Sequence, residues 1–195
     1  MIVITNPSAI ANEISLIDSL FEEGLSLLHI RKPVFSEIEM VEFIKQIKLE
    51  YRSNLVLHNH HQLAEDSGIN RIHFSEKDRK NSFLVNPDQK IFSTSTHSIE
   101  DFNSLENFDY AFLSPVFSSI SKEDYHPKEN LFEALKSRTN NKTKVIALGG
   151  INSENIKKTL ENGFDNVALL GTIWNHKNPI KQFKLCHKIV LSHSL

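Results

Sequence analysis

The sequence has little cysteine, almost no net charge and no long apolar run, and each shortage excludes a class of protein. Its one cysteine, Cys186, excludes an internal disulfide framework and agrees with a reducing compartment. The net charge of -2 provides no basic footprint for nucleic acid. No run of about 18 apolar residues occurs, as a membrane span would need, and the opening MIVITNP lacks a basic signal segment. We therefore expect a cytoplasmic protein that binds neither nucleic acid nor membrane.

The chain also lacks a linker rich in proline, glycine or serine that would divide it. Its 195 residues fit one hydrophobic core, since single cores stop growing beyond about 250 residues. We expect a single domain over residues 1–195.

Short apolar, β-branched runs recur along the chain, and each is followed by an amphipathic stretch, which is the pattern of repeated βα units. Eight such units indicate an α/β protein with a parallel sheet, and the number eight favours closure into a (β/α)8 TIM barrel. An open doubly wound sheet is the alternative. The expected strands are Ile2–Thr5, Leu27–Arg31, Leu55–His58, Arg71–Phe74, Lys90–Ser95, Tyr110–Pro115, Lys144–Gly149 and Asn166–Ile173.

Local signals mark the connections between these strands. Ser98 and Asp101 are spaced as a capping box, and Asn152 or Ser153 can cap the helix that ends near Gly163. The unit between Phe74 and Lys90 is the weakest and has room only for a short helix. The long connection of residues 116–129 is a candidate active-site flap.

In such a barrel the active site gathers at the carboxyl ends of the strands. Arginine, lysine, hydroxyl groups and paired glycines at these ends suggest a phosphorylated ligand, because glycines let backbone N–H groups approach phosphate oxygens. Gly149-Gly150 could instead be a simple tight turn, and Arg31-Lys32 a solvated pair. The residues selected are His29, Arg31, Lys32, His58, Asn59, Asp78, Ser95, Ser119, Ser121, Lys122, Gly149, Gly150, Gly171 and Thr172.

Ten histidines are more than expected, and several fall near strand ends. His58 and His60 form an HxH pair that could bind zinc, but zinc needs three or four converging ligands and we find no convincing third. Hydrogen-bonding or solvated histidines are the preferred interpretation. We expect His73, inside an apolar strand, to be a hydrogen-bonded core residue, and His97 to do no more than begin a helix.

Nearly the whole chain resembles the thiamine phosphate synthase and thiazole tautomerase (TenI) superfamily, whose fold is a (β/α)8 barrel. The resemblance rests on the order and spacing of several motifs. They are LLHIRKP (27–33), LHNHHQLA (57–64), RIHFSEKD (71–78), STHS (95–98), FLSPVFSSISKED (112–124), VIALGGINSENI (145–156) and NVALLGTI (166–173).

The synthase joins hydroxymethylpyrimidine pyrophosphate to thiazole phosphate and expels pyrophosphate along a carbocation-like path assisted by Mg²⁺. The resemblance implies that Arg31 binds pyrophosphate, that Lys122 is the family's basic loop residue and that Asp78 binds magnesium. It also implies that Ser119 and Ser121, which replace threonines, hold the thiazole phosphate with Gly149-Gly150. Ser95 falls on a ligand-binding position.

Departures from the family pattern concentrate at the third strand. His58-Asn59 stands where the synthase has Asn-Asp, so one metal carboxylate becomes a neutral amide and the Mg²⁺ site is weakened. Pro33 replaces a lysine, for which Lys32 could partly substitute. Pro115 keeps the synthase-like residue where the tautomerase carries its catalytic histidine.

We therefore expect a thiamine phosphate synthase, with His58 binding the pyrimidine or transferring protons. A thiazole tautomerase and a non-catalytic thiazole-phosphate-binding or regulatory paralogue are the alternatives. The expected partners are small phosphorylated substrates.

Overall fold

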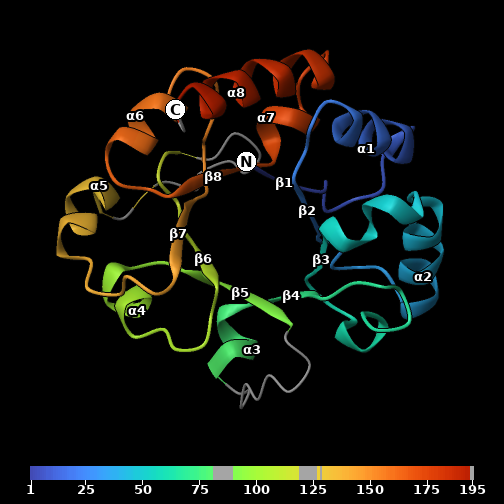
Figure 1. Ribbon diagram of the computed structural model, residues 1–195, viewed down its shortest axis with the longest axis horizontal. Coiled ribbons are helices and arrows are strands. Elements are labelled where there is room, and N and C mark those ends of the chain that lie inside the picture. Colours follow the sequence, from blue (N-terminus) through green and yellow to red (C-terminus); the bar gives the residue numbers. More distant parts are fainter. Residues whose placement is uncertain (81–89, 119–126, 128, 194–195) are drawn as a thin grey trace.

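A computed structural model describes residues 1–80, 90–118, 127 and 129–193. Its strands form one closed barrel in which each pairs in parallel with the next along the chain and β8 closes onto β1 (Figure 1). This confirms the predicted (β/α)8 architecture. The strands are β1 (Ile2–Ile4), β2 (Leu27–Ile30), β3 (Leu55–Leu57), β4 (Arg71–Phe74), β5 (Ile91–Thr96), β6 (Tyr110–Leu113), β7 (Lys144–Ala147) and β8 (Asn166–Leu169).

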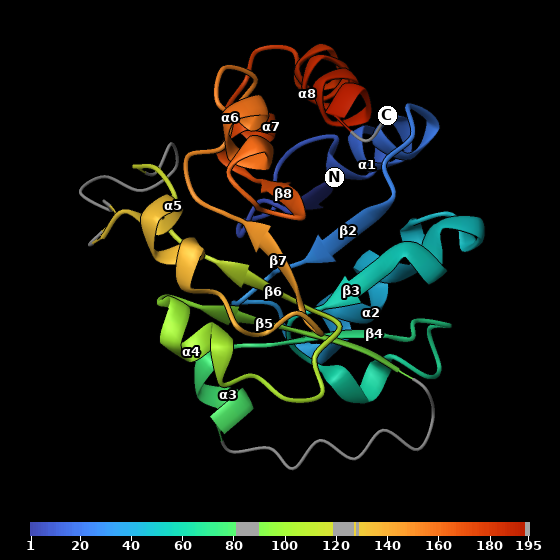
Figure 2. The same ribbon diagram turned by 60° about the vertical axis from the view of Figure 1, so that its left-hand side comes forward.

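Helices surround the barrel, and a second view shows them packed outside the ring of strands (Figure 2). The α-helices are α1 (Glu13–Glu22), α2 (Glu37–Gln46), α3 (Glu76–Lys80), α4 (Ile99–Asn103), α5 (Leu131–Ala134), α6 (Ile156–Glu161), α7 (Gly171–Trp174) and α8 (Pro179–His193). Three 3₁₀ turns, η1 (Leu49–Asn54), η2 (His61–Leu63) and η3 (Leu135–Ser137), complete the described elements.

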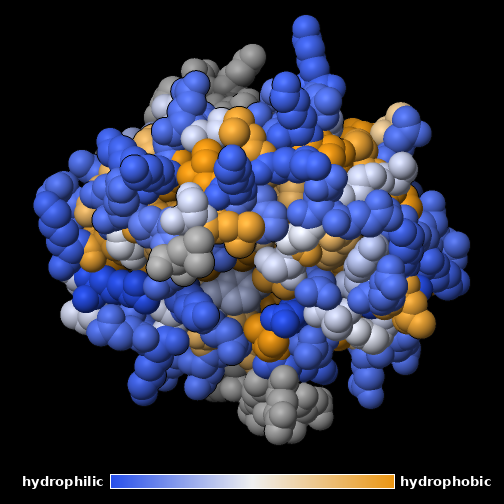
Figure 3. All heavy atoms as spheres, turned by 45° about the horizontal axis from the view of Figure 1, so that its top comes forward, coloured by the Kyte–Doolittle hydropathy of each residue, from blue (hydrophilic) through white to orange (hydrophobic). Residues whose placement is uncertain are grey.

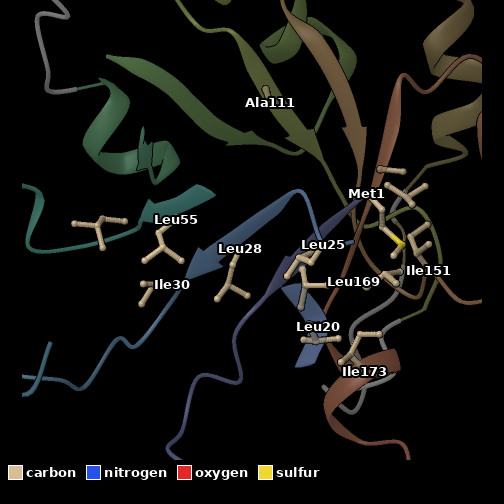
Figure 4. Packing of buried hydrophobic residues seen from close by; sticks show 14 of the residues in the cluster. Met1, Leu20, Leu25, Leu28, Ile30, Leu55, Ala111, Ile151, Leu169 and Ile173 are labelled. Carbon is tan, nitrogen blue, oxygen red and sulfur yellow. The ribbon is translucent and has the colours of Figure 1, made fainter. Parts of the chain in front are cut away.

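The strands are apolar on both faces because the sheet lies between two packed layers. The outer face packs against the helices, and Figure 4 shows part of this layer, where Leu28 and Ile30 of β2 lie beside Leu55 of β3. Side chains of alternate strand residues fill the barrel interior instead. The apolar members of that inner cluster are Ile2, Ile4, Tyr110, Phe112, Ile146 and Ala168.

Three local predictions need correction. The run expected as one strand, 166–173, leaves the sheet after Leu169, because α7 begins at Gly171. The Ser98 hydroxyl accepts from the Asp101 backbone N–H as expected, but the Asp101 carboxylate pairs with Arg79 at 2.7 Å rather than closing a capping box. The carboxylate has a charged partner close by, and that pairing links α4 to α3.

Helix α6 begins at Ile156, with Asn155 at its N-cap, so neither Asn152 nor Ser153 is the capping residue. The Asn155 side chain instead holds the preceding turn: its oxygen accepts from the Asn152 N–H and its amide donates to the Gly150 carbonyl, both at 2.9 Å. This turn lies directly after β7, so the cap of the helix also shapes the mouth of the barrel.

Polar side chains cover most of the face drawn in Figure 3, with apolar groups scattered between them. Within the described part of the chain, no helix has the length and apolar character needed to cross a membrane.

Candidate active site at the carboxyl ends of the strands

A cavity of about 580 Å³ opens at the carboxyl ends of the strands, where the sequence predicts the site. Its lining mixes apolar, hydroxyl, imidazole and charged groups. The lining residues are Ile4, Arg31, Pro33, His58, Asn59, His73, Ser75, Glu76, Lys77, Ser95, His97, Phe112, Ser114, Leu148, Gly149 and Leu170. A larger hollow of about 1110 Å³ lies between residues 103–109 and 139–143, which precede β6 and β7 and so sit at the other end of the barrel.

Arg31 follows β2 and brings a positive charge to the cavity. Its backbone is tied to β1, because its N–H donates to the Thr5 hydroxyl at 2.9 Å and its carbonyl accepts from the same hydroxyl at 3.3 Å. Among the described residues, no carboxylate pairs with its guanidinium. A cation without a counter-ion among the described residues favours an anionic ligand.

Three imidazoles lie together at the floor of the cavity. His29 of β2 and His73 of β4 are buried, and His58 follows β3. The Nδ1 of His29 lies 2.8 Å from the Nε2 of His58, and the His58 and His73 rings stack with centroids 4.1 Å apart. β2, β3 and β4 are neighbours in the sheet, and their pairing places these three side chains together on its inner face, which the linear sequence did not reveal.

Each buried imidazole also has a hydroxyl partner. The Nε2 of His29 lies 2.8 Å from the Tyr110 phenol oxygen of β6. His73 lies between two serines of β5, with Nδ1 2.9 Å from Ser93 Oγ and Nε2 3.0 Å from Ser95 Oγ. His73 is thus the hydrogen-bonded core histidine that the sequence predicts, and in addition it lines the cavity.

The three histidines place one ring nitrogen each within 4.8 Å of the others, the arrangement of a possible metal site. Imidazole lone pairs lie in the ring plane, and the His58 and His73 planes are only 24° from parallel. Nearly parallel planes do not let both lone pairs converge on one ion. The cluster is therefore built for hydrogen bonding, and His60 of the HxH pair is turned away toward the Phe35 carbonyl, at 2.8 Å.

Burial lowers the pKa of all three histidines. For His73 the pKa falls to about 3, chiefly by loss of hydration and then by the charges of His61 and Arg31. The pKa values of His29 and His58 fall well below the usual value, first because of burial and then because of His73. The floor is therefore neutral at physiological pH.

Lys32, which the sequence suggests as a substrate-binding residue, does not line the cavity. Its side chain is fully buried away from the cavity, and its ammonium lies 2.6 and 2.7 Å from the two Glu13 oxygens. It also donates to the Asn6 and Ser8 carbonyls at 2.8 and 3.0 Å. Lys32 therefore ties the β1–α1 connection to β2 as a structural ion pair.

His29 also differs from its expected role, because it is fully buried beneath His58 and does not line the cavity. Both of its ring nitrogens are engaged by protein groups. His29 contacts His58 and not the cavity, so it is a supporting residue.

The glycine turn after β7 is required by close packing. Gly149 and Gly150 have φ of 99° and 64°, which side-chain-bearing residues rarely adopt. A Cβ at Gly149 would lie 2.8 Å from Pro115 Cα, and one at Gly150 would lie 2.7 Å from Phe117 Cβ. No described residue accepts a hydrogen bond from the N–H groups of these two glycines.

The second expected phosphate turn lies beside the first but outside the cavity lining. Gly171 and Thr172 are buried first residues of α7, and the Thr172 hydroxyl donates to the Ile151 carbonyl. This bond holds the two turns together. The Thr172 hydroxyl is thereby engaged within the protein.

Of Asn59 and Asp78, the pair expected near magnesium, only Asn59 lines the cavity. The Oδ1 of Asn59 is a buried oxygen without a hydrogen-bond partner. The exposed Asp78 carboxylate accepts from the Ser75 hydroxyl at 2.6 Å at the start of α3 and does not line the cavity. Mg²⁺ favours several oxygen ligands, including carboxylates, so these donors do not by themselves fit a protein-held ion.

Three expected site residues, Ser119, Ser121 and Lys122, lie outside the described residues. The sequence reasoning missed several residues that line the cavity, namely Ser75, Glu76, Lys77, His97 and Ser114. The Nδ1 of His97 lies 2.8 Å from the Ser114 carbonyl. Its position directly after β5 was a signal that it belongs to the strand-end set.

Known proteins of the same kind match most of the chain. A family model described as thiamine monophosphate synthase matches residues 1–173. A thiamine-phosphate synthase from Clostridium tetani is 28% identical over 85% of this chain and 81% of its own length. The solved thiamine phosphate pyrophosphorylase from Bacteroides thetaiotaomicron is 30% identical, with a TM-score of 0.79 over 97% of this chain and 96% of that one.

A more distant structure, 3-hexulose-6-phosphate synthase from Salmonella typhimurium, has a TM-score of 0.73 at 17% identity over 98% of this chain and 99% of that one, and it shares the fold alone. The relatives above do not favour the tautomerase or the non-catalytic alternative. The match over residues 1–173 and the shared barrel fold show that the chain belongs to the thiamine monophosphate synthase family.

Proposed function

We propose that this protein joins hydroxymethylpyrimidine pyrophosphate to thiazole phosphate, forming thiamine phosphate and releasing pyrophosphate. The observation that carries the proposal is the Arg31 guanidinium, which faces the cavity without a carboxylate partner among the described residues. In a chain of this family, an uncompensated cation at the strand ends suits a substrate whose leaving group is a polyanion.

Arg31 acts on the leaving group in this proposal. When the bond to pyrophosphate breaks, negative charge grows on the departing oxygens, and a fixed guanidinium stabilises that charge more than it stabilises the bound substrate. The Thr5 hydroxyl holds the Arg31 backbone in place from both sides. Lys122, in the connection between β6 and α5, is proposed to help stabilise the same negative charge.

The thiazole phosphate is proposed to bind at the Gly149-Gly150 turn. This turn has two N–H groups to which no described residue provides an acceptor. Because glycine has no side chain, phosphate oxygens can approach the backbone there. Ser119 and Ser121 are proposed to complete this site. Gly171 and Thr172 hold the neighbouring turn through the Thr172–Ile151 bond.

His58, Asn59 and Ser95 are proposed to receive the pyrimidine ring. They line one part of the cavity together, and the neutral His58 ring is supported from beneath by His29. A neutral polar floor can hydrogen-bond the ring nitrogens and amino group of a pyrimidine without a charge penalty. His58 therefore contributes to orienting the reacting carbon.

Magnesium dependence is also part of the proposal. The protein offers the unpartnered Asn59 oxygen, whereas the nearby carboxylates are engaged: Asp78 by Ser75 and Glu76 by Lys80 at 2.5 Å. We expect a bound Mg²⁺ ion to take most of its ligands from substrate phosphates and water, at millimolar rather than micromolar concentrations. The cytoplasmic location and the single-domain organisation stay predictions.

The test is formation of thiamine phosphate from both substrates across a range of Mg²⁺ concentrations. Arg31→Gln should lower kcat/KM about tenfold to hundredfold, because a hydrogen bond to a charged group contributes about 1.5–3 kcal/mol. Lys157→Gln, which removes one exposed positive charge on α6, is the matched control and should leave the rate unchanged. A folded wild-type protein that forms no thiamine phosphate at any Mg²⁺ concentration would refute the proposal.

A further inference from the structure

His97 follows β5 directly and continues the inward-facing series of that strand into the cavity. Side chains alternate along a strand, and Ser93 and Ser95 both point to the inner face of the barrel, where they contact His73. His97 is the next member of this alternate series and lines the cavity one step closer to its mouth than Ser95. It is exposed to solvent, so a ligand that enters the mouth can contact it.

The contact with Ser114 determines which ring nitrogen of His97 carries the proton. The Nδ1 of His97 lies 2.8 Å from the Ser114 carbonyl oxygen, and a carbonyl oxygen can only accept a hydrogen bond. Nδ1 is therefore the protonated nitrogen. The Ser114 hydroxyl lies 3.4 Å from the same nitrogen and is the longer contact. In the neutral ring, Nε2 is left as a bare nitrogen that accepts hydrogen bonds.

This bare nitrogen is available to a ligand. Within the described part of the chain, the side-chain hydrogen bonds of His97 all involve Nδ1. Glu76 is the one carboxylate among the described lining residues, and it is paired with Lys80 at 2.5 Å. A carboxylate is itself an acceptor, so it cannot satisfy Nε2. The group that suits this position is a hydrogen-bond donor on the ligand.

We propose that the Nε2 of His97 accepts a hydrogen bond from the amino group of the pyrimidine substrate and so determines specificity for it. The inference rests on the proposed function, in which His58, Asn59 and Ser95 receive the pyrimidine ring. For a ring held at Ser95, the next inward-facing side chain along β5 is His97. The amino group is the donor that such a ring carries on its edge.

The same contact contributes to catalysis. When the bond to pyrophosphate breaks, its electron pair leaves with the pyrophosphate oxygen, and positive charge remains on the exocyclic carbon. The amino nitrogen shares its lone pair with that carbon through the ring, so its N–H groups become stronger donors. A hydrogen bond from them to Nε2 therefore strengthens in the transition state. The amino group keeps both of its protons throughout.

The contact distinguishes an amino group from an oxo group at the same ring position. An oxo oxygen brings a second acceptor against the bare Nε2, and neither atom then has a donor. A site that accepts from an N–H group on its substrate discriminates against an analogue that lacks this group. His97 is thus expected to exclude oxo pyrimidines from a site whose other polar groups can bind either compound.

The experiment is calorimetric titration at pH 8 with hydroxymethylpyrimidine pyrophosphate and with its analogue that carries an oxo group in place of the amino group. Wild type should bind the amino compound about tenfold more tightly or better. His97→Asn keeps an amide N–H near the position of Nδ1 for the Ser114 carbonyl but has no group at the position of Nε2. This variant should bind the two compounds with similar affinity.

Two further variants separate this contact from general damage. His176→Asn changes an exposed histidine outside the cavity lining, whose Nδ1 also lies near a carbonyl, that of Asn178, at 3.0 Å, and it should keep the wild-type preference. His97→Gln places an amide near the position of Nε2. Since an amide can turn either its oxygen or its N–H groups to the ligand, this variant should bind the oxo compound more tightly than His97→Asn does. A loss of folded protein lowers both affinities alike and leaves their ratio unchanged.

The formation of thiamine phosphate by the same proteins distinguishes the possible failures. His97→Asn should also lower kcat, because the hydrogen bond strengthens in the transition state. If wild type forms thiamine phosphate but binds both compounds equally, or if His97→Asn keeps the full preference or the full kcat, the inference is overturned and the proposed reaction stands. If wild type forms no thiamine phosphate, the proposed function fails and this inference fails with it.

Discussion

Acid should destabilise this protein through His73, and the size of the effect follows from its burial. The pKa of His73 is about 3 in the folded protein against about 6.5 when unfolded. Because the folded-state pKa is the lower one, the unfolded chain binds the proton more readily between these values. The stabilisation is therefore complete above pH 6.5 and is lost as the pH falls toward 3.

A pH of 5 lies about 1.5 units below the pKa of the unfolded histidine, and each unit corresponds to about 1.36 kcal/mol of stability. We therefore expect His73 alone to lower the free energy of unfolding by about 2 kcal/mol between pH 8 and pH 5. His29 and His58 act in the same direction, since their pKa values are also lowered by burial.

Urea unfolding of wild type and His73→Phe at several pH values measures this contribution. The variant should lose about 2 kcal/mol less than the wild type between pH 8 and pH 5, whatever its stability at pH 8. Ser95→Ala, which removes a His73 partner but no titrating group, should keep most of the wild-type pH dependence. Equal losses in wild type and His73→Phe would refute the reasoning from burial.

Three further changes test the structural roles assigned above. Lys32→Met should cost about 3–5 kcal/mol of stability in thermal or urea unfolding, because it leaves the Glu13 carboxylate buried without its partner. Adding Glu13→Leu should recover much of this loss. If the double variant recovers nothing, the ion-pair explanation is wrong. Gly150→Ala should cost more than the roughly 1–2 kcal/mol of left-handed strain, whereas Gly68→Ala, at φ 70° with open space around it, should cost the strain alone. Asn59→Asp should tighten Mg²⁺ binding measured by calorimetry in the presence of pyrophosphate, and an unchanged affinity would show that this side chain does not contact the ion.

The sequence alone determined the parallel sheet because its strands must be buried on both faces, and the number of units, eight, favoured its closure into a barrel. Runs such as Val145–Ala147 and Val167–Leu169 are apolar without alternation, and only a parallel sheet between two packed layers buries all of them. The position of the site followed from the same pattern, since polar residues come directly after these runs. Arg31, His58 and Gly149 were found in this way.

Only the tertiary structure decided which of the strand-end residues face the cavity. Lys32 follows Arg31 in the chain, yet it is turned to Glu13, whose place beside it depends on how α1 packs. The hydrogen bond between His29 and Tyr110 likewise joins residues 81 positions apart. Such pairs arise from the closure and stagger of the barrel, which bring inward-facing residues of different strands to one level, and local sequence patterns carry no information on that level.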